Sequence, residues 1–209
     1  KNLQERWAAV ARSAGWAALV VDSYGHRRIS KFQAYATVCT GLQLWGRERA
    51  GDLFAMMEWA RRQPWIDPTR IAIAGWSHGG WTALDAMSMT PGRQIENATR
   101  VSGLPDEPLA GLTGAFIVYP YQGIGALAPI HGLRVDVPVQ AITVGVEGLR
   151  VVKDPVVMVG GSVHHPDRRT LRDHGAGHLG VLHHDPEQPL IRARPPQSFL
   201  DNCRGARRF

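Results

Sequence analysis

The sequence predicts an α/β fold with a mostly parallel, doubly wound sheet and helices on both of its faces. Short apolar runs typical of strands buried on both sides alternate with segments of helical apolar spacing, which is the order expected of βαβ units. In addition, the apolar run 71–74 leads through Gly75-Trp76-Ser77-His78-Gly79-Gly80 straight into a helix-forming segment. A strand, a glycine-flanked turn and a helix in direct succession are typical of such a sheet at its carboxyl edge.

Composition limits the class of protein. The 209 residues are 44% hydrophobic and 20% charged, which indicates one soluble globular domain rather than a disordered chain or a membrane protein. The formal net charge is +6, but basic residues are spread along the chain and often stand beside acidic ones, which argues against a nucleic-acid partner. Cys39 and Cys203 are far apart and in no metal-ligand spacing, so neither a disulfide framework nor a zinc site is indicated.

The sequence shows no targeting or membrane segment. No apolar run approaches the roughly 18 to 20 residues of a membrane span, and no signal peptide is visible. Because the chain begins at Lys1 rather than at methionine, we expect the sequence to start partway into a domain. The oligomeric state and the compartment stay open, with the cytoplasm preferred.

The first half of the chain predicts a helix, a strand and a second helix. Residues 2–14 place apolar side chains at i, i+4, i+7, i+8 and i+11, which favours a helix ending at Gly15. The continuous apolar run 16–21 predicts a buried strand. Residues 47–62 repeat the helical spacing with a core-facing stripe, and Pro64 ends that helix. The stripe consists of Ala50, Leu53, Phe54, Met57 and Ala60.

The second half predicts further strands and a less regular end. Residues 65–69 indicate a turn into the strand before Ser77, and a helix over 79–89 follows. Residues 91–113 lack periodicity and are interpreted as a loop that folds over the site. The apolar runs 114–119 and 137–144 predict two more strands.

The character of the chain changes after about residue 150. Residues 155–159 still favour a strand, but six of the nine histidines fall between His164 and His184, and the last stretch is rich in Arg and Pro. We expect a single domain over 1–182 and an irregular, poorly packed tail over 183–209. A shifted reading frame or an atypical terminus is one hypothesis for this region, and the nucleotide sequence tests it.

Ser77 is the predicted nucleophile. A serine on a sharp strand-to-helix turn has strained dihedral angles, so Gly75 and Gly79 must be small enough for the chain to pass close by. The Oγ of Ser77 then stands clear of the sheet, and the backbone N–H of His78 points to where negative charge develops on an attacked carbonyl. The alternative is a Gly-rich turn without chemistry.

A serine hydroxyl needs a base, and the base needs an orienting carboxylate. In this arrangement the acid and then the histidine follow the serine along the chain, each after the carboxyl end of a strand. Glu147 follows the strand 137–144 and is the preferred acid. Asp136 and Asp154 each precede an apolar run, which places them at the opposite edge of the sheet.

His178 is the preferred base because it lies in a flexible Gly-rich loop, His174-Gly175-Ala176-Gly177-His178. His174 and His183 remain alternatives. The spacing of His174 and His178 would suit a metal pair on a helix, but the intervening glycines argue against a helix, so no metal site is expected. The side chain of His78 should point away from the Oγ of Ser77 and serve in lining or packing.

Three stretches resemble the dienelactone hydrolase family of the α/β-hydrolase superfamily. They are WAALVVDSYGHR at 16–27, RAGDLFAMMEWARRQPWIDPTRIAIAGWSHGGWTAL at 49–84 and GAFIVYPYQG at 114–123. The resemblance covers about residues 7–147 and is most specific around GWSHGG. It implies an α/β-hydrolase fold and hydrolysis of small carboxylic esters or lactones through an acyl-enzyme, without a cofactor.

The resemblance places the nucleophile on Ser77, the acid on Glu147 and the base on His178. Dienelactone hydrolase proper has Cys as nucleophile and usually Asp as acid, so this chain points to a broader esterase-like branch. The family also has a helix between the acid and the last strand, where this chain continues almost at once into PVVMVG. Related hydrolases take a second oxyanion N–H from a loop just before the first helix, so the resemblance implies that N-terminal strands and this oxyanion loop are missing from the sequence.

The acyl pocket is predicted from loops at the same edge. Tyr24 follows the strand 16–21, and Tyr121 and Gln122 follow GAFIVYP, so each is expected to line the substrate site or to pack within its loop. Two other functions remain. A serine peptidase of the prolyl-oligopeptidase type shares the Gly-x-Ser-x-Gly-Gly turn but usually carries a large accessory domain, for which 209 residues leave no room. A non-catalytic hydrolase-fold binding domain would lack a histidine at Ser77.

Overall fold

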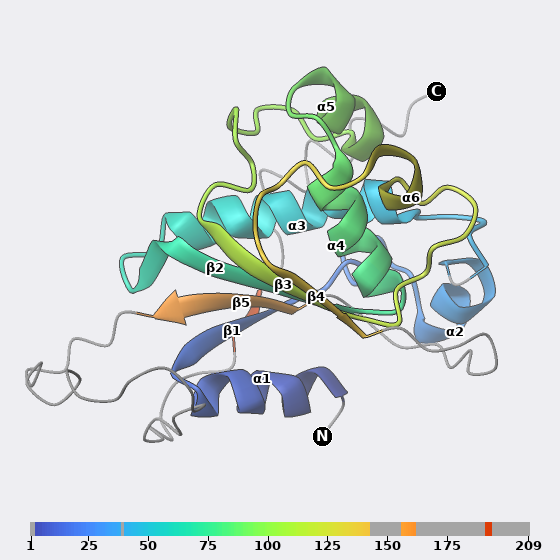
Figure 1. Ribbon diagram of the computed structural model, residues 1–209. Helices are drawn as coiled ribbons and strands as arrows, with labels where there is room; N and C mark the ends of the chain where they lie inside the picture. Colours follow the sequence, from blue (N-terminus) through green and yellow to red (C-terminus); the bar gives the residue numbers. More distant parts are fainter. Residues whose placement is uncertain (1–2, 39, 143–155, 162–190, 194–209) are drawn as a thin grey trace, which may run out of the picture.

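The strands form one six-stranded sheet in the computed structural model, which describes residues 3–38, 40–142, 156–161 and 191–193 (Figure 1). The strands are β1 Trp16–Val21, β2 Ile66–Trp76, β3 Leu112–Val118, β4 Val139–Ile142, β5 Val156–Gly161 and β6 Ile191–Ala193. They lie in the order β4-β3-β2-β5-β1-β6. The continuous apolar run of β1 fits a strand that is covered on both faces.

Five of the six strands point the same way. β5 pairs antiparallel with both β1 and β2, so β1 and β2 are parallel to each other. β3 and β4 continue the sheet in parallel beyond β2, and β6 is parallel to β1. The predicted mostly parallel sheet is therefore confirmed, with β5 as the reversed strand. The carboxyl ends of β1, β2, β3 and β4 all lie at one edge.

Helices cover both faces of the sheet (Figure 1). They are α1 Leu3–Ser13, α2 Lys31–Gln33, the π-helical turn η1 Ala34–Val38, α3 Gly46–Arg61, α4 His78–Ser88, α5 Arg93–Thr99 and α6 Ala128–His131. Alternate side chains of β2 separate the two faces: Ile73 faces the core beneath α3 and α4, and Trp76 packs with Trp7 of α1 on the opposite face. This is the doubly wound arrangement.

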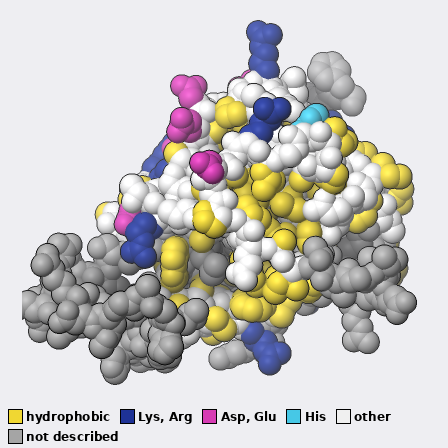
Figure 2. Space-filling view, in the orientation of Figure 1, with side chains coloured by type: hydrophobic (Ala, Val, Ile, Leu, Met, Phe, Trp, Pro, Cys, Tyr) yellow, Lys and Arg dark blue, Asp and Glu magenta, His cyan; other side chains and the backbone are white. Residues whose placement is uncertain are grey.

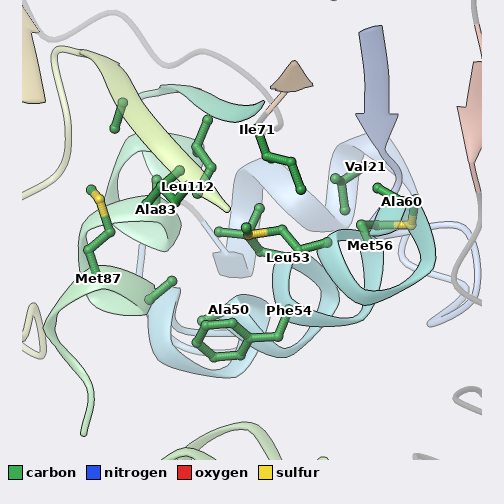
Figure 3. Packing of buried hydrophobic residues seen from close by; sticks show 14 of the residues in the cluster. Val21, Ala50, Leu53, Phe54, Met56, Ala60, Ile71, Ala83, Met87 and Leu112 are labelled. Carbon is green, nitrogen blue, oxygen red and sulfur yellow. The ribbon is translucent and has the colours of Figure 1, made fainter. Parts of the chain in front are cut away.

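The main core lies between α3, α4 and the sheet. Figure 3 shows side chains of α3 and α4 meeting those of β1, β2 and β3. The stripe predicted for the second helix is fully buried there, because α3 is enclosed by the sheet, by α4 and by α5. The buried stripe consists of Ala50, Leu53, Phe54, Met57 and Ala60.

Two local predictions are wrong. The predicted turn over 65–69 belongs mostly to β2, which begins at Ile66. Residues 67–70 lie within this strand, where its register with β5 shifts between Ile66 and Ile71. The predicted loop over 91–113 contains α5 and the start of β3. α5 was missed because it has seven residues and buries only Ile95 and Thr99 fully, too few to establish a helical period.

Within the residues that the structure describes, no helix is long and apolar enough to cross a membrane. Of the predicted irregular tail 183–209, the structure describes only Ile191–Ala193, which pair as β6 with β1, so the irregular tail stays a prediction. The domain limit at residue 182 stays a prediction.

Candidate active site

Ser77 occupies the turn between β2 and α4. Its φ of 52° and ψ of −118° are strained for a residue other than glycine, as expected of a serine on a sharp strand-to-helix turn. The N–H of Ser77 donates to the carbonyl of Val118 at 3.0 Å, and its carbonyl accepts from the N–H of Trp81 at 3.0 Å. The half-buried side chain does not cap the helix, so the hydroxyl is not committed to α4.

Glycine is required at position 75 because two backbones meet there. A Cβ on Gly75 would stand 2.5 Å from the carbonyl oxygen of Gly79 and 2.8 Å from the amide nitrogen of Gly80. These are backbone atoms of the first turn of α4, so no side-chain rotation could relieve the contact. The close approach of β2 and α4 therefore fixes the sharpness of the turn that carries Ser77.

His78 begins α4 directly after Ser77. The first N–H groups of a helix have no acceptor within the helix and lie at its positive end. The backbone N–H of His78 is therefore chemically suited to bind an oxyanion. The ring of His78 is buried and receives a hydrogen bond from Nη1 of Arg49 at Nδ1, over 2.9 Å. Burial and the Arg49 cation lower the pKa of His78 to about 3, which makes this imidazole unsuited as the base.

The predicted pocket residues occupy different environments. The ring of Tyr24 lies beneath the guanidinium of Arg49, with 4.9 Å from Cζ to the ring centroid. Tyr121 packs its ring on Trp81 at 4.7 Å between centroids, and its N–H approaches the carbonyl oxygen of Ser77 at 3.4 Å. Gln122 is exposed. Tyr121 therefore lies next to the turn of Ser77, whereas Tyr24 supports a buried residue behind it.

Several large hydrophobic side chains of the segment 121–142 are exposed. In Figure 2 hydrophobic side chains gather across the middle of the visible face. The large exposed hydrophobic residues of this segment are Tyr121, Ile124, Ile130, Leu133 and Ile142. Of these, Tyr121 lies next to the turn of Ser77, whereas Leu133 lies near the far end of α4, because the N–H of Arg134 donates to the carbonyl of Met87.

The predicted acid and base lie outside the described residues. This holds for Glu147 and His178, and for the alternative bases His174 and His183. Among the described histidines, His26 lies in the loop after β1, with Nε2 3.7 Å from Oδ1 of Asp52, and burial lowers its pKa. In the part of the chain that the structure covers, no three His, Cys, Asp or Glu side chains gather as a metal site.

Sequence patterns missed a buried charged cluster behind the turn. Arg49 and Asp52 are fully buried although they stand on the predicted second helix. Asp52 accepts hydrogen bonds from both terminal nitrogens of Arg27, at 2.6 and 3.0 Å. Charged residues on a helix normally indicate a solvated face. The signal that was available is that Arg49, Asp52 and the buried Leu53 share the i, i+3, i+4 spacing of one face.

Asp85 is a second buried acid that the sequence did not single out. It lies one turn after Trp81 on α4, is fully buried, and accepts a hydrogen bond from the N–H of Leu127 at 2.7 Å. Burial raises the pKa of Asp85 from 3.8 to about 7, although the hydrogen bond from Leu127 and the Arg47 cation favour the charged form. The carboxyl therefore couples α4 to the loop before α6 in a pH-dependent way.

Asp85→Asn is expected to change how stability depends on pH. The folded pKa of Asp85 is the higher one, so its contribution is complete below 3.8 and is lost as the pH rises towards 7. Each pH unit of this window changes the free energy of unfolding by about 1.4 kcal/mol. Asparagine can still accept from Leu127, and urea unfolding between pH 4 and 8 should show this falling limb in the wild type only. The exposed Asp106→Asn serves as control, and an unchanged limb in Asp85→Asn would assign the slope to another group.

Comparison with known proteins gives a family match over the part of the chain that contains the Ser77 turn. The model of the prolyl oligopeptidase family matches residues 5–93. Probable dipeptidyl-aminopeptidase B of Colletotrichum graminicola is 31% identical over 97 residues, which are 46% of this chain and 10% of that protein. The protein of the same name from Talaromyces marneffei is 31% identical over 98 residues, with the same coverage. No solved structure matches the chain significantly.

The chain spans about a tenth of the length of these relatives. The lack of room for an accessory domain in 209 residues therefore does not count against a peptidase. The resemblance to dienelactone hydrolase is supported only at the level of the shared superfamily, because the match is to the prolyl oligopeptidase family. A parallel sheet covered on both faces, with a strained serine between β2 and α4, agrees with that match. The chain therefore has the α/β-hydrolase fold.

Proposed function

We propose that the protein is a serine hydrolase that acts through an acyl-enzyme with Ser77 as nucleophile. The observation that carries this proposal is the strained Ser77 at the start of α4, whose side chain does not cap that helix and which has the N–H of His78 beside it. The Oγ of Ser77 attacks a carbonyl carbon, and the developing oxyanion accepts a hydrogen bond from that N–H. His178 takes the proton from Oγ and returns it to the leaving group, and Glu147 orients the imidazolium. Water then releases the acyl group by the same steps.

A peptide bond is the first candidate substrate. The support comes from the matches to the prolyl oligopeptidase family and to proteins named dipeptidyl-aminopeptidase. Hydrolysis of small carboxylic esters or lactones is the second candidate, supported by the resemblance of residues 16–27, 49–84 and 114–123 to dienelactone hydrolases. We propose that Tyr121 contacts the acyl side of either substrate, because its N–H approaches the carbonyl oxygen of Ser77 and its ring packs on Trp81.

Labelling with a fluorophosphonate tests the nucleophile. The purified protein is expected to form a covalent adduct at Ser77, identified by mass spectrometry of the labelled peptide. Ser77→Ala should lose the adduct and all turnover above background, whereas Ser102→Ala, which changes an exposed serine, should retain both. A folded wild type that is not labelled would reject the hydrolase proposal and favour a non-catalytic binding domain.

Two chromogenic substrates then separate the substrate classes. A dipeptidyl p-nitroanilide presents an amide with a poor leaving group, and p-nitrophenyl acetate presents an activated ester. Ser77-dependent release from both supports a peptidase, because an enzyme that cleaves amides also cleaves activated esters. Release from the ester alone would support the esterase candidate and contradict the peptidase. The binding of a substrate without Ser77-dependent turnover would contradict both.

A further inference from the structure

Arg49 lies fully buried in the first turns of α3, directly behind the turn that carries Ser77. Its Nη1 is 2.9 Å from Nδ1 of His78, and its guanidinium lies over the ring of Tyr24. The arginine thus connects three segments of the carboxyl edge, namely the loop after β1, the start of α3 and the start of α4. Taking a guanidinium out of water is costly, so such a position requires specific compensating contacts.

The contact with His78 defines the state of that ring. A guanidinium has only N–H donors, so Nδ1 of His78 must accept and the ring proton must be on Nε2. A second proton on Nδ1 would face the cation, which agrees with a strongly lowered pKa of His78. The same ring packs on Trp81 at 4.8 Å between centroids, one turn further along α4. The ring is therefore held on two sides.

The position of the His78 ring also restrains the position of the His78 backbone. His78 is the first residue of α4, and its N–H is the donor that the proposed function assigns to the oxyanion. We propose that Arg49 is a positioning residue, which holds the neutral ring of His78 against Trp81 and so fixes the N–H of His78 beside Ser77. This inference rests on the proposed serine hydrolase function. Arg49 acts through His78 and has no contact with the substrate in this scheme.

Arg49→Met tests the proposal because methionine keeps an unbranched apolar side chain but no donor. The variant is expected to react with fluorophosphonate at Ser77 about 10- to 100-fold more slowly per folded molecule, as for a small misplacement of catalytic groups. Arg49→Lys keeps a cation and a donor but not the planar fork, so it should recover part of the rate. It also serves if Arg49→Met does not fold.

The tautomer and pKa of the His78 imidazole give a second measurement, which would not change if Arg49 only stabilised the fold. In ¹⁵N NMR spectra the wild type should show Nδ1 unprotonated and Nε2 protonated down to about pH 4, whereas Arg49→Met should show mixed tautomers and a raised pKa. Arg61→Met is the matched control. Arg61 is on the same helix and donates to the carbonyls of Pro108 and Ala110, so its loss should lower stability without changing the labelling rate per folded molecule.

Two results would overturn the inference. One is a folded Arg49→Met variant that reacts as fast as the wild type, and the other is an unchanged His78 tautomer in that variant. If the wild type is not labelled at all, the hydrolase proposal fails by itself. In that case the NMR comparison still decides whether Arg49 sets the state of His78, so the two failures are distinguishable.

Discussion

Gly75→Ala is expected to reduce the reaction of Ser77 with fluorophosphonate by at least about 100-fold. The added Cβ would stand 2.5 Å from the carbonyl oxygen of Gly79, so α4 must move away from β2 by more than any side-chain adjustment can provide. That movement displaces Ser77 and the N–H of His78 together, because both lie where α4 begins. Overpacking of this kind also lowers the free energy of unfolding by about 1 to 3 kcal/mol.

The matched control for this prediction is Gly114→Ala in the neighbouring strand β3. A Cβ on Gly114 would have its nearest neighbour, the carbonyl oxygen of Pro138, at 3.3 Å, which needs an adjustment of only a few tenths of an ångström. Labelling kinetics and urea unfolding of both variants separate the local effect from the general cost of alanine in a strand. Equal labelling of Gly75→Ala and wild type would show that the turn is not tightly constrained.

Asp52→Asn is expected to lower the free energy of unfolding by about 3 to 5 kcal/mol. Asp52 is fully buried and accepts two hydrogen bonds from Arg27, whose side chain is only 17% exposed. Asparagine keeps the shape but leaves the buried guanidinium of Arg27 without its negative partner. The damage should extend to the loop after β1, because Arg27 also donates to the carbonyl of Ser23 at 2.8 Å.

A double variant separates the charge effect from packing. Replacement of both partners, Arg27→Met with Asp52→Leu, removes the buried charges together and is expected to recover most of the loss seen in Asp52→Asn. Urea unfolding of the wild type, of the single variants Arg27→Met and Asp52→Leu, and of the double variant measures this coupling. If the double variant loses as much as the two single losses added, the two residues contribute independently and the ion-pair explanation is wrong.

Apolar periodicity predicted the elements that decide the fold. The strand over 16–21 and the buried stripe of α3 both lie where the sequence predicts them. A strand buried on both faces gives a continuous apolar run, and a helix buried on one face gives an apolar spacing of about 3.6 residues. The turn at Ser77 was predictable for a different reason, since the strained backbone and the contact of Gly75 with Gly79 require a specific local pattern. These features depend on neighbours in sequence.

Features that depend on distant partners were not predictable. Arg49 and Asp52 are polar residues that sequence patterns assign to solvent, and partners from other segments, among them Arg27 and His78, explain their burial. Residues 155–159 were expected as a strand and β5 occupies 156–161, but its reversed direction depends on the edges of β1 and β2 between which it lies. Glu147 and His178 stay predictions, since both lie beyond the described residues.

The place of β5 in the sheet has a consequence for how the protein is made. In the sheet formed by the described residues, β5 lies between β1 and β2 and pairs with both, and it is synthesised long after them. Pairings between segments so far apart in the chain form slowly, because the intervening polypeptide must first be ordered. On the ribosome, the edges of β1 and β2 that face each other therefore stay open to other strands until residue 161 has emerged, and this interval is when the nascent chain is most prone to aggregate.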